Sequence, residues 1–223
     1  MKKLSLFFCL LVFLVSCGNE IDYSATYTSD KFETGDVRLF TKNGEIKNSS
    51  TISSFLSRHK GRYFESSSMT NSYLQSSVTL QFLSATDAKL TYGNVQLLTV
   101  ITKSNLIYLE SKDTTYTGQR YYDYPGASES IYNAMLKYSP LYNDTVLLAN
   151  SDYNYFIRTK QCFYMTQSGN ELKMPFMSYY YHEPYGEHSG TFINNCFNVD
   201  CIKLMASNDT LAIQQAQLVL KKK

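Results

Sequence analysis

The stretch SVTLQFLSATDAKLTYGNVQLLTVITKSNLIYLE, Ser77 to Glu110, decides the fold class. In its first run the apolar residues Val78, Leu80 and Phe82 alternate with polar ones, which is the period of a β-strand with one buried face. The runs KLTYG, VQLLTVI and NLIYLE follow, and each is bounded by residues that favour turns. Short strands joined by short turns, with no helical pattern between them, predict an antiparallel meander.

The second half of the chain repeats this strand pattern. Apolar runs of strand length occur at residues 145–150, 153–159, 161–167, 171–181, 190–197, 200–206 and 210–220. Two segments have a helical period instead, one around Ile52, Phe55 and Leu56, after candidate capping residues at 49–51, and one over residues 128–139. Because helices do not alternate with strands, we expect an all-β or β-dominated α+β fold, with an antiparallel meander forming a sandwich or a barrel and two short helices.

The beginning of the chain, MKKLSLFFCLLVFLVSC, has the layout of an export signal. Lys2 and Lys3 precede an apolar stretch, Leu4 to Val15, that is too short to span a bilayer comfortably as a helix. The stretch ends in Leu-Val-Ser-Cys, which resembles the lipobox of bacterial lipoproteins. The resemblance implies that the signal is removed before Cys17, whose thiol then carries a diacylglycerol and whose amine carries a further acyl chain such as palmitate.

This resemblance has consequences for location and domain organisation. Two or more acyl chains anchor a protein stably in a membrane, whereas one chain gives only marginal binding. Gly18, which follows the cysteine, is compatible with delivery to the outer membrane of the cell envelope, on its periplasmic or its surface face. We expect a signal peptide at 1–16, a lipid-anchored tether at 17–34 and a single β-rich domain at 35–223, with a candidate internal boundary near 125–127.

The charge of the chain argues against a nucleic-acid partner. The chain has 21 Lys and Arg against 19 Asp and Glu, and two of the lysines lie in the signal, so the remaining part is balanced at 19 against 19. Proteins that bind nucleic acid usually carry a basic surface. Tyrosine is the compositional outlier, with 20 residues beside 13 Phe and no Trp. Tyrosine favours strands and surfaces that are partly exposed to solvent, which suits a β-rich exported protein.

The cysteines beyond Cys17 are Cys162, Cys196 and Cys201, once Cys9 has left with the signal. An exported protein can form disulfides, and Cys196 and Cys201 flank a short segment that could turn tightly enough to join them. A bond from Cys162 to either of them is an alternative, and so is a set of three buried thiols that behave as small apolar side chains.

The segment YYYHEPYGEHSG, residues 179–190, holds the best candidate metal ligands. His182, His188, Glu183 and Glu187 are the types of residue that bind zinc and similar metals. The two histidines are six residues apart and do not form an HExxH motif, so a loop would have to bring them together. The alternative is an ordinary β-hairpin with Pro-Tyr-Gly at its turn.

Tyrosine clusters are the remaining candidate site. The candidate ligand-stacking residues are Tyr121, Tyr122, Tyr124, Tyr179 and Tyr181. Packing between neighbouring strands is the alternative role. No nucleophile elbow or phosphate-binding glycine loop is present, and no cofactor is indicated. We therefore expect a non-enzymatic, membrane-anchored binding or interaction module with a protein or glycan partner. A lipocalin-like barrel carrying a small apolar ligand and a metal-dependent hydrolase using His182 and His188 are the alternatives.

Overall fold

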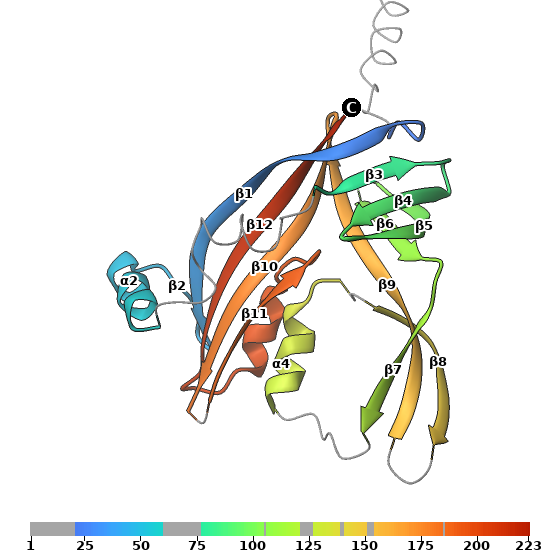
Figure 1. The fold of residues 1–223 in the computed structure, drawn as a ribbon. Coiled ribbons are helices and arrows are strands. Elements are labelled where there is room, and N and C mark those ends of the chain that lie inside the picture. Colours follow the sequence, from blue (N-terminus) through green and yellow to red (C-terminus); the bar gives the residue numbers. More distant parts are fainter. Residues whose placement is uncertain are drawn as a thin grey trace, which may run out of the picture.

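The protein is built mainly from β-strands (Figure 1). The computed structural model describes residues 21–59, 77–104, 106–120, 127–138, 141–150, 154–184 and 186–223. The strands are β1 (Thr26–Thr41), β2 (Gly44–Ile46), β3 (Thr79–Phe82), β4 (Asp87–Tyr92), β5 (Asn94–Lys103), β6 (Leu106–Ser111), β7 (Thr115–Arg120), β8 (Leu141–Asn150), β9 (Asn154–Ser168), β10 (Glu171–Glu183), β11 (Gly186–Ile193) and β12 (Thr210–Lys222). The helical elements are α2 (Ser49–Arg58), α4 (Ala127–Met135) and the 3₁₀-helix η1 (Val199–Leu204).

Eight of these strands close into an antiparallel barrel. Around the ring the hydrogen-bonded order is β1, β3, β4, β5, β6, β9, β10 and β12, and β12 pairs back to β1. Strands β3 to β6 are the meander that residues 77–110 predict. The β-dominated fold class is therefore confirmed, and the closed ring selects the barrel over the sandwich.

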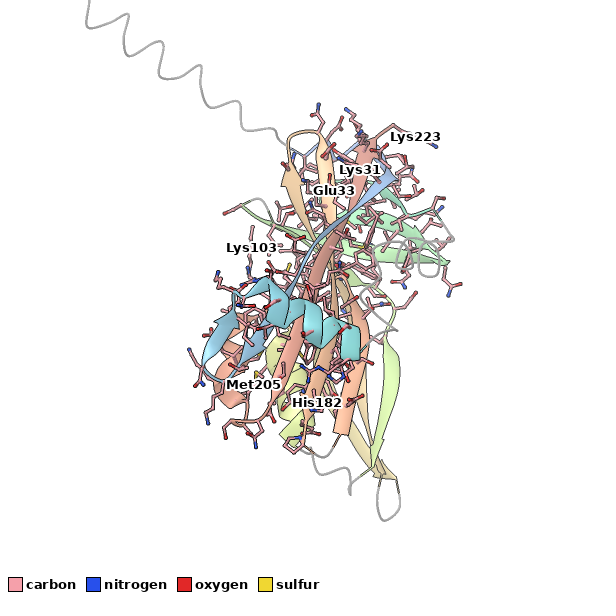
Figure 2. The ribbon with its side chains drawn as sticks, turned by 90° about the vertical axis from the view of Figure 1, so that its left-hand side faces the viewer. Lys31, Glu33, Lys103, His182, Met205 and Lys223 are labelled. Carbon is pink, nitrogen blue, oxygen red and sulfur yellow. The ribbon has the colours of Figure 1, made fainter. Side chains whose placement is uncertain are left out.

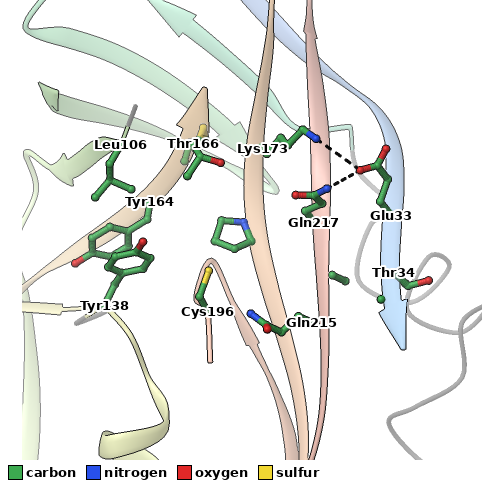
Figure 3. Close-up of a pocket in the computed structure, with 14 residues that line it drawn as sticks. Glu33, Thr34, Leu106, Tyr138, Tyr164, Thr166, Lys173, Cys196, Gln215 and Gln217 are labelled. Carbon is green, nitrogen blue, oxygen red and sulfur yellow. Dashed lines mark hydrogen bonds and ion pairs between the residues drawn. The ribbon is translucent and has the colours of Figure 1, made fainter. Parts of the chain in front are cut away.

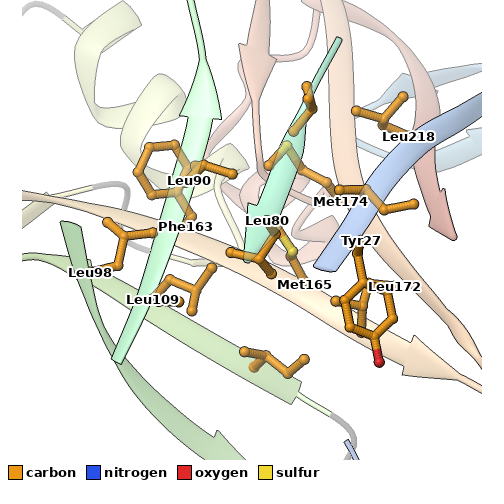
Figure 4. Packing of buried hydrophobic residues seen from close by; sticks show 14 of the residues in the cluster. Tyr27, Leu80, Leu90, Leu98, Leu109, Phe163, Met165, Leu172, Met174 and Leu218 are labelled. Carbon is orange, nitrogen blue, oxygen red and sulfur yellow. The ribbon is translucent and has the colours of Figure 1, made fainter. Parts of the chain in front are cut away.

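Large apolar side chains fill the interior of the barrel. Alternate residues of each strand point inward, and Leu80 of β3, Leu90 of β4 and Leu98 of β5 are at most 1% exposed (Figure 4). The strands that close the ring add further buried side chains, among them Leu109, Phe163, Met165, Leu172, Met174 and Leu218. Each such side chain contributes about 1.5–3 kcal/mol when it leaves water, so the interior is the main source of stability.

Beyond the barrel the strands separate into two leaves (Figure 1). The first leaf continues β10, β12 and β1, flanked by β11 and β2, and the second consists of β9 between β7 and β8. Helix α2 covers one face of the first leaf, where Phe55 packs against Tyr180. Helix α4 and η1 cover the other face, where Met135 and Cys201 share a cluster with Tyr181. Tyr180 and Tyr181 are successive residues of β10, so they point to opposite faces of the leaf. Tyr180 packs in the cluster under α2, and Tyr181 packs in the cluster under α4 and η1.

Strand β1 bends where the barrel joins the first leaf. Its register against β12 shifts between Thr34 and Val37, which marks a β-bulge. Gly35 lies in this bulge, and a Cβ there would stand 3.2 Å from the carbonyl oxygen of Gln215. The side-chain amide of Gln214 donates a 3.1 Å hydrogen bond to the carbonyl of Gly35. The close backbone approach favours glycine, because a Cβ would press on this carbonyl oxygen, and the bulge lets one strand serve both the barrel and the leaf.

The expected tether at 17–34 needs correction. Residues 26–34 form the first half of β1, and Ile21 is already in the barrel core at 8% exposure. The sequence conceals this strand because most of its side chains are half-buried or exposed, so no apolar alternation is visible. The folded part that the structure describes therefore begins at Ile21.

Two other expectations also change. Residues 200–206 contain most of η1 in place of a strand, and the side chain of Asn198 caps its first turn by accepting from the Asp200 N–H. The runs 153–159 and 161–167 belong to the single strand β9. Both differences arise because the apolar runs are short. The pattern of a short run does not distinguish a strand from a helix, and it does not show where a strand ends.

The two predicted helices are confirmed as α2 and α4. The cap of α2 is Asn48, whose side-chain oxygen accepts a 2.9 Å hydrogen bond from the Thr51 N–H, and not one of residues 49–51. In the ranges that the structure describes, every helix is too short or too polar to cross a bilayer.

Candidate functional site

The barrel has a seam where β9 and β10 separate. The two strands pair only near their shared turn, from Thr166 opposite Lys173 to Ser168 opposite Glu171. Further along, β9 remains paired with β6, while β10 pairs with β12 and β11. Pro175 lies where β10 changes its neighbour from β9 to β11, and a proline is tolerated in a sheet where one neighbour is absent. The seam thus leaves a stretch of β9 that has β6 on one side and no strand on the other.

Asn194 closes this stretch of β9 with its side chain. Its amide oxygen accepts a 2.6 Å hydrogen bond from the Tyr164 N–H, and its amide nitrogen donates a 2.9 Å hydrogen bond to the Cys162 carbonyl. Residues two apart on a strand direct their backbone groups to the same side, so one side chain replaces the missing strand. Asn194 is 3% exposed and has a φ of 65°, a left-handed conformation that asparagine tolerates better than most residues.

The next residue, Asn195, holds Tyr138 at the seam. Its side-chain oxygen accepts a 3.1 Å hydrogen bond from the Tyr138 N–H, and its nitrogen donates a 2.7 Å hydrogen bond to the Tyr138 carbonyl. The ring of Tyr138 then stacks on Tyr164, with centroids 4.4 Å apart and planes 17° apart. Tyr108 packs on Tyr164 as well, at a centroid distance of 5.2 Å. The seam therefore carries a fixed aromatic wall.

A cleft of about 490 Å³ lies outside the barrel beside this wall (Figure 3). We call it the seam cleft. Its aromatic wall contains Tyr138 and Tyr164, and Leu106 extends it along β6. The residues of the opposite side come from β1, β10 and β12 and from the turn after β11: Glu33, Thr34, Gly35, Lys173, Pro175, Cys196, Gln215, Ala216 and Gln217. Met165 and Thr166 of β9 complete the lining.

The wall opposite the tyrosines is polar and electrically balanced. The Gln217 amide donates a 2.5 Å hydrogen bond to Glu33, and the Lys173 ammonium lies 3.9 Å from the same carboxylate. Hydrogen bonds from Lys31 and Gln217 hold the pKa of Glu33 below its usual range, so this carboxylate is ionised at neutral pH. Gln215 adds a second amide. One anion and one cation therefore face the cleft together with hydrogen-bonding amides.

Two further ionisable groups of the lining, one on each side of the cleft, keep their protons. Burial raises the pKa of Tyr164 to about 12, with smaller contributions from Cys162 and Tyr138. Burial also raises the pKa of the Cys196 thiol. A thiol must ionise to act as a nucleophile, so Cys196 is suited to contact and not to covalent catalysis. The cleft thus offers hydrogen bonds and apolar surface.

The two histidines of the candidate metal set lie on opposite faces of the β10–β11 hairpin. His182 stands opposite Glu187 in the register, and His188 opposite Tyr181. His182 Nδ1 lies 3.5 Å from Glu187 Oε1, and His188 Nε2 lies 3.0 Å from Glu183 Oε1. The structure therefore splits the four residues into two His–Glu pairs. Within the described ranges, no three His, Cys, Asp or Glu side chains are grouped in a way that could hold a metal.

The third histidine, His59, joins the first pair from the end of α2. Its Nδ1 lies 2.8 Å from the Tyr180 hydroxyl and 3.4 Å from Glu187 Oε1, and its ring packs on His182 at 5.4 Å. A hydrogen bond from Tyr180, together with the two histidines, lowers the pKa of Glu187. His59 follows α2, and its contacts are with residues of the β10–β11 hairpin, so the cluster holds α2 against the hairpin.

The cysteine and tyrosine candidates are placed as follows. Cys162, Cys196 and Cys201 are all thiols, and burial, assisted by Asp200, raises the pKa of Cys201 to about 12. Tyr181 is 1% exposed and its hydroxyl donates a 2.5 Å hydrogen bond to the buried Asp209, so it is a core residue.

Tyr179 stacks on Phe192 at 5.1 Å and meets Tyr132 edge-on at 5.5 Å, so it packs against its neighbours. Tyr121, Tyr122 and Tyr124 lie outside the described residues, as does Cys17.

Sequence reasoning missed the residues that build the seam. Asn194, Asn195 and Tyr138 belong to no motif, and the only signal in the sequence is the polar pair Asn-Asn directly after an apolar strand.

Comparison with known proteins adds no family: no protein-family model, no curated protein and no solved structure matches this chain.

Proposed function

We propose that this chain is an envelope lipoprotein, anchored through Cys17, that acts as a non-enzymatic binding module. Its ligand occupies the seam cleft and is a small uncharged molecule rich in hydroxyl or amide groups, such as a short saccharide. The observation that carries the proposal is the cleft itself, with aromatic rings on one wall and hydrogen-bonding side chains on the other. Ligand sites typically combine apolar surface with a few placed polar groups, in volumes of about 300–1,000 Å³.

The charges around the cleft favour an uncharged ligand. Glu33 and Lys173 are the two charged residues of the lining and lie 3.9 Å apart, so an anion or a cation bound there would meet a charge of its own sign beside its partner; Lys31, which also contacts Glu33, is not part of the lining. The amides of Gln215 and Gln217 both donate and accept hydrogen bonds, as hydroxyl and amide groups of a ligand require. A phosphate or a nucleotide, by contrast, would place its charge beside Glu33.

The preference for binding over catalysis rests on the protonation of the wall. Tyr164 and Cys196 both have raised pKa values and remain neutral at physiological pH. General bases and nucleophiles work best when their pKa lies near the working pH. These groups therefore support recognition by hydrogen bonds.

A lipocalin-like carrier of an apolar ligand is the second candidate, and the closed eight-stranded ring favours it. Barrels of this size hold either packed side chains or one small ligand. Here Leu80, Leu98 and Leu109 point inward at 0% exposure, so an apolar ligand would have to displace them. This alternative would be favoured if an apolar fluorescent dye binds the lipidated protein in excess detergent and its emission stays the same when residues of the cleft are substituted.

The test uses a thermal-shift screen of the purified lipidated protein in detergent, against neutral mono- and disaccharides and small amides. Gln215→Trp places a large ring in the cleft, and Val95→Trp, at a position 60% exposed on β5, is the matched control. Compounds that raise Tm should lose their effect in Gln215→Trp and keep it in Val95→Trp. A screen without stabilising compounds, or compounds that stabilise both variants equally, would contradict the proposal.

A further inference from the structure

The length of chain between the anchor and the fold limits how the protein can sit on a membrane. We infer that the end of the barrel where Ile21 joins the core docks directly on the headgroup surface of a phospholipid bilayer. This inference rests on the proposed lipid anchor at Cys17. It adds an interaction surface and fixes the orientation of the domain, neither of which the binding proposal requires.

The first step is the reach of the connecting segment. Ile21 is 8% exposed and belongs to the barrel core, and Ala25 follows it at 6%. Three residues lie between Cys17 and Ile21, so four Cα–Cα steps join them. A fully extended chain spans at most about 3.3–3.6 Å per residue, so this end of the barrel stays within about 14 Å of the acylated cysteine. That distance is short compared with the domain, so the barrel cannot lift away from the surface and turn freely.

The short connection turns one particular end of the barrel toward the lipid. The last residues of β12 lie beside the start of the fold, because the Lys223 N–H donates to the Thr26 carbonyl at 2.8 Å and the Lys222 ammonium contacts Asp22 at 2.5 Å. The turn between β9 and β10 lies at the same end, since Glu171 pairs with Lys221.

Figure 2 shows Lys31 and Lys223 at this end of the molecule. His182 and Met205 lie at the opposite end. We call the surface formed by residues 21–31, 168–171 and 221–223 the basal surface.

The third step concerns charge. Three of the four lysines of the basal surface are paired with carboxylates: Lys31 with Glu33 at 2.5 Å, Lys221 with Asp30 at 2.8 Å and Lys222 with Asp22 at 2.5 Å. The carboxylate of Glu171 offsets the fourth, Lys223, in the net charge of the surface. A balanced surface of this kind gains little from anionic lipids, whose attraction for basic segments grows with each unpaired cation. Docking therefore depends on the short connection to the anchor, and a zwitterionic phosphatidylcholine bilayer is sufficient for it.

The orientation also places the seam cleft. Lys173, which lines the cleft, is two residues from Glu171 of the basal turn, so the cleft opens on the flank of the barrel close to the membrane. His182 of the β10–β11 hairpin and Met205, which follows η1, lie at the end away from Lys223 (Figure 2). A ligand of the cleft would thus be met near the bilayer surface.

The experiment uses the full lipidated protein in phosphatidylcholine liposomes that carry a nitroxide in the headgroup. The chain has no tryptophan, so a single introduced one is a unique fluorophore. Lys223→Trp reports on the basal surface, and Leu204→Trp, 56% exposed in η1, is the matched control at the far end. We expect the nitroxide lipid to quench the fluorescence of Lys223→Trp and to leave Leu204→Trp unchanged, at low and high salt.

A third variant separates docking from anchoring. A twenty-residue Gly/Ser insertion after Gly18 gives the domain an additional root-mean-square reach of about 25 Å. It should abolish the quenching of Lys223→Trp while the protein still floats with the liposomes. If the uninserted protein floats with liposomes but Lys223→Trp is not quenched, or Leu204→Trp is quenched equally, the docking inference is overturned and the anchor stands. If the protein does not float at all, the anchor is refuted and the docking inference falls with it.

Discussion

Replacing Asn194 should reveal how much the seam of the barrel depends on one side chain. Asn194→Ala removes the acceptor for the Tyr164 N–H and the donor to the Cys162 carbonyl, and both groups are buried. Each buried polar group left unpaired costs about 1–3 kcal/mol, so we expect a loss of about 2–6 kcal/mol in the free energy of unfolding. Alanine must also adopt the positive φ of 65°, which adds strain.

The assay is urea denaturation of residues 18–223, which include every described residue, followed by far-UV circular dichroism. Asn194→Gly should lose less than Asn194→Ala, because glycine adopts positive φ without a steric penalty. Asn94→Ala, at the exposed first residue of β5, is the control and should stay within about 0.5 kcal/mol of the wild type. An Asn194→Ala protein within about 1 kcal/mol of the wild type would refute the view that this side chain replaces a strand.

Three further predictions concern stability. Tyr181→Phe removes the 2.5 Å hydrogen bond to the buried carboxylate of Asp209 and should lower the free energy of unfolding, measured in urea, by about 1.5–3 kcal/mol. Tyr23→Phe is the control and should change it far less, because the hydrogen bond between the Tyr23 and Thr102 hydroxyls is exposed. Arg38→Lys should cost only about 0.2–1 kcal/mol, because it replaces the two-bond contact with Glu45 at a partly exposed site, and a larger loss would mean that the pair is more than a surface ion pair. The pKa of the Cys201 thiol is near 9 in the unfolded chain and about 12 in the folded protein. Between these values only the unfolded state loses the proton, so stability should fall as the pH rises across this window. Cys201→Ala should flatten this part of the pH profile of Tm, measured by thermal denaturation.

The sequence was sufficient for the parts of the fold that depend on local patterns. The meander from β3 to β6 was predictable because β3 has period-two alternation and the runs that follow are of strand length and are bounded by residues that favour turns. Helix α2 was predictable from the spacing of Ile52, Phe55 and Leu56. The hairpin between β1 and β2 turns at Lys42 and Asn43, and Gly44, which follows them, has a positive φ of 115° that glycine adopts without strain.

The seam could not be predicted, because it depends on pairings distant in the sequence. Strands β1 and β12, which close the ring, are almost two hundred residues apart, as in the pair Tyr27 and Lys222. The use of Asn194 to replace a strand depends on where β9 leaves β10, and no local pattern specifies that point. The same reason explains the histidines: spacing alone could not show that His182 and His188 point to opposite faces of a hairpin.

The most direct test of the central claim, that a ligand occupies the seam cleft and not the barrel interior, is a methyl chemical-shift map by NMR. The lipidated protein in detergent is titrated with the compound that stabilises it most. Leu106 lines the cleft, while Leu80 and Leu98 point into the barrel at 0% exposure. If the ligand occupies the cleft, the methyl signals of Leu106 shift with saturation while those of Leu80 and Leu98 stay in place. Shifts confined to Leu80 and Leu98, with Leu106 unchanged, would contradict it and favour a carrier that holds its ligand inside the barrel.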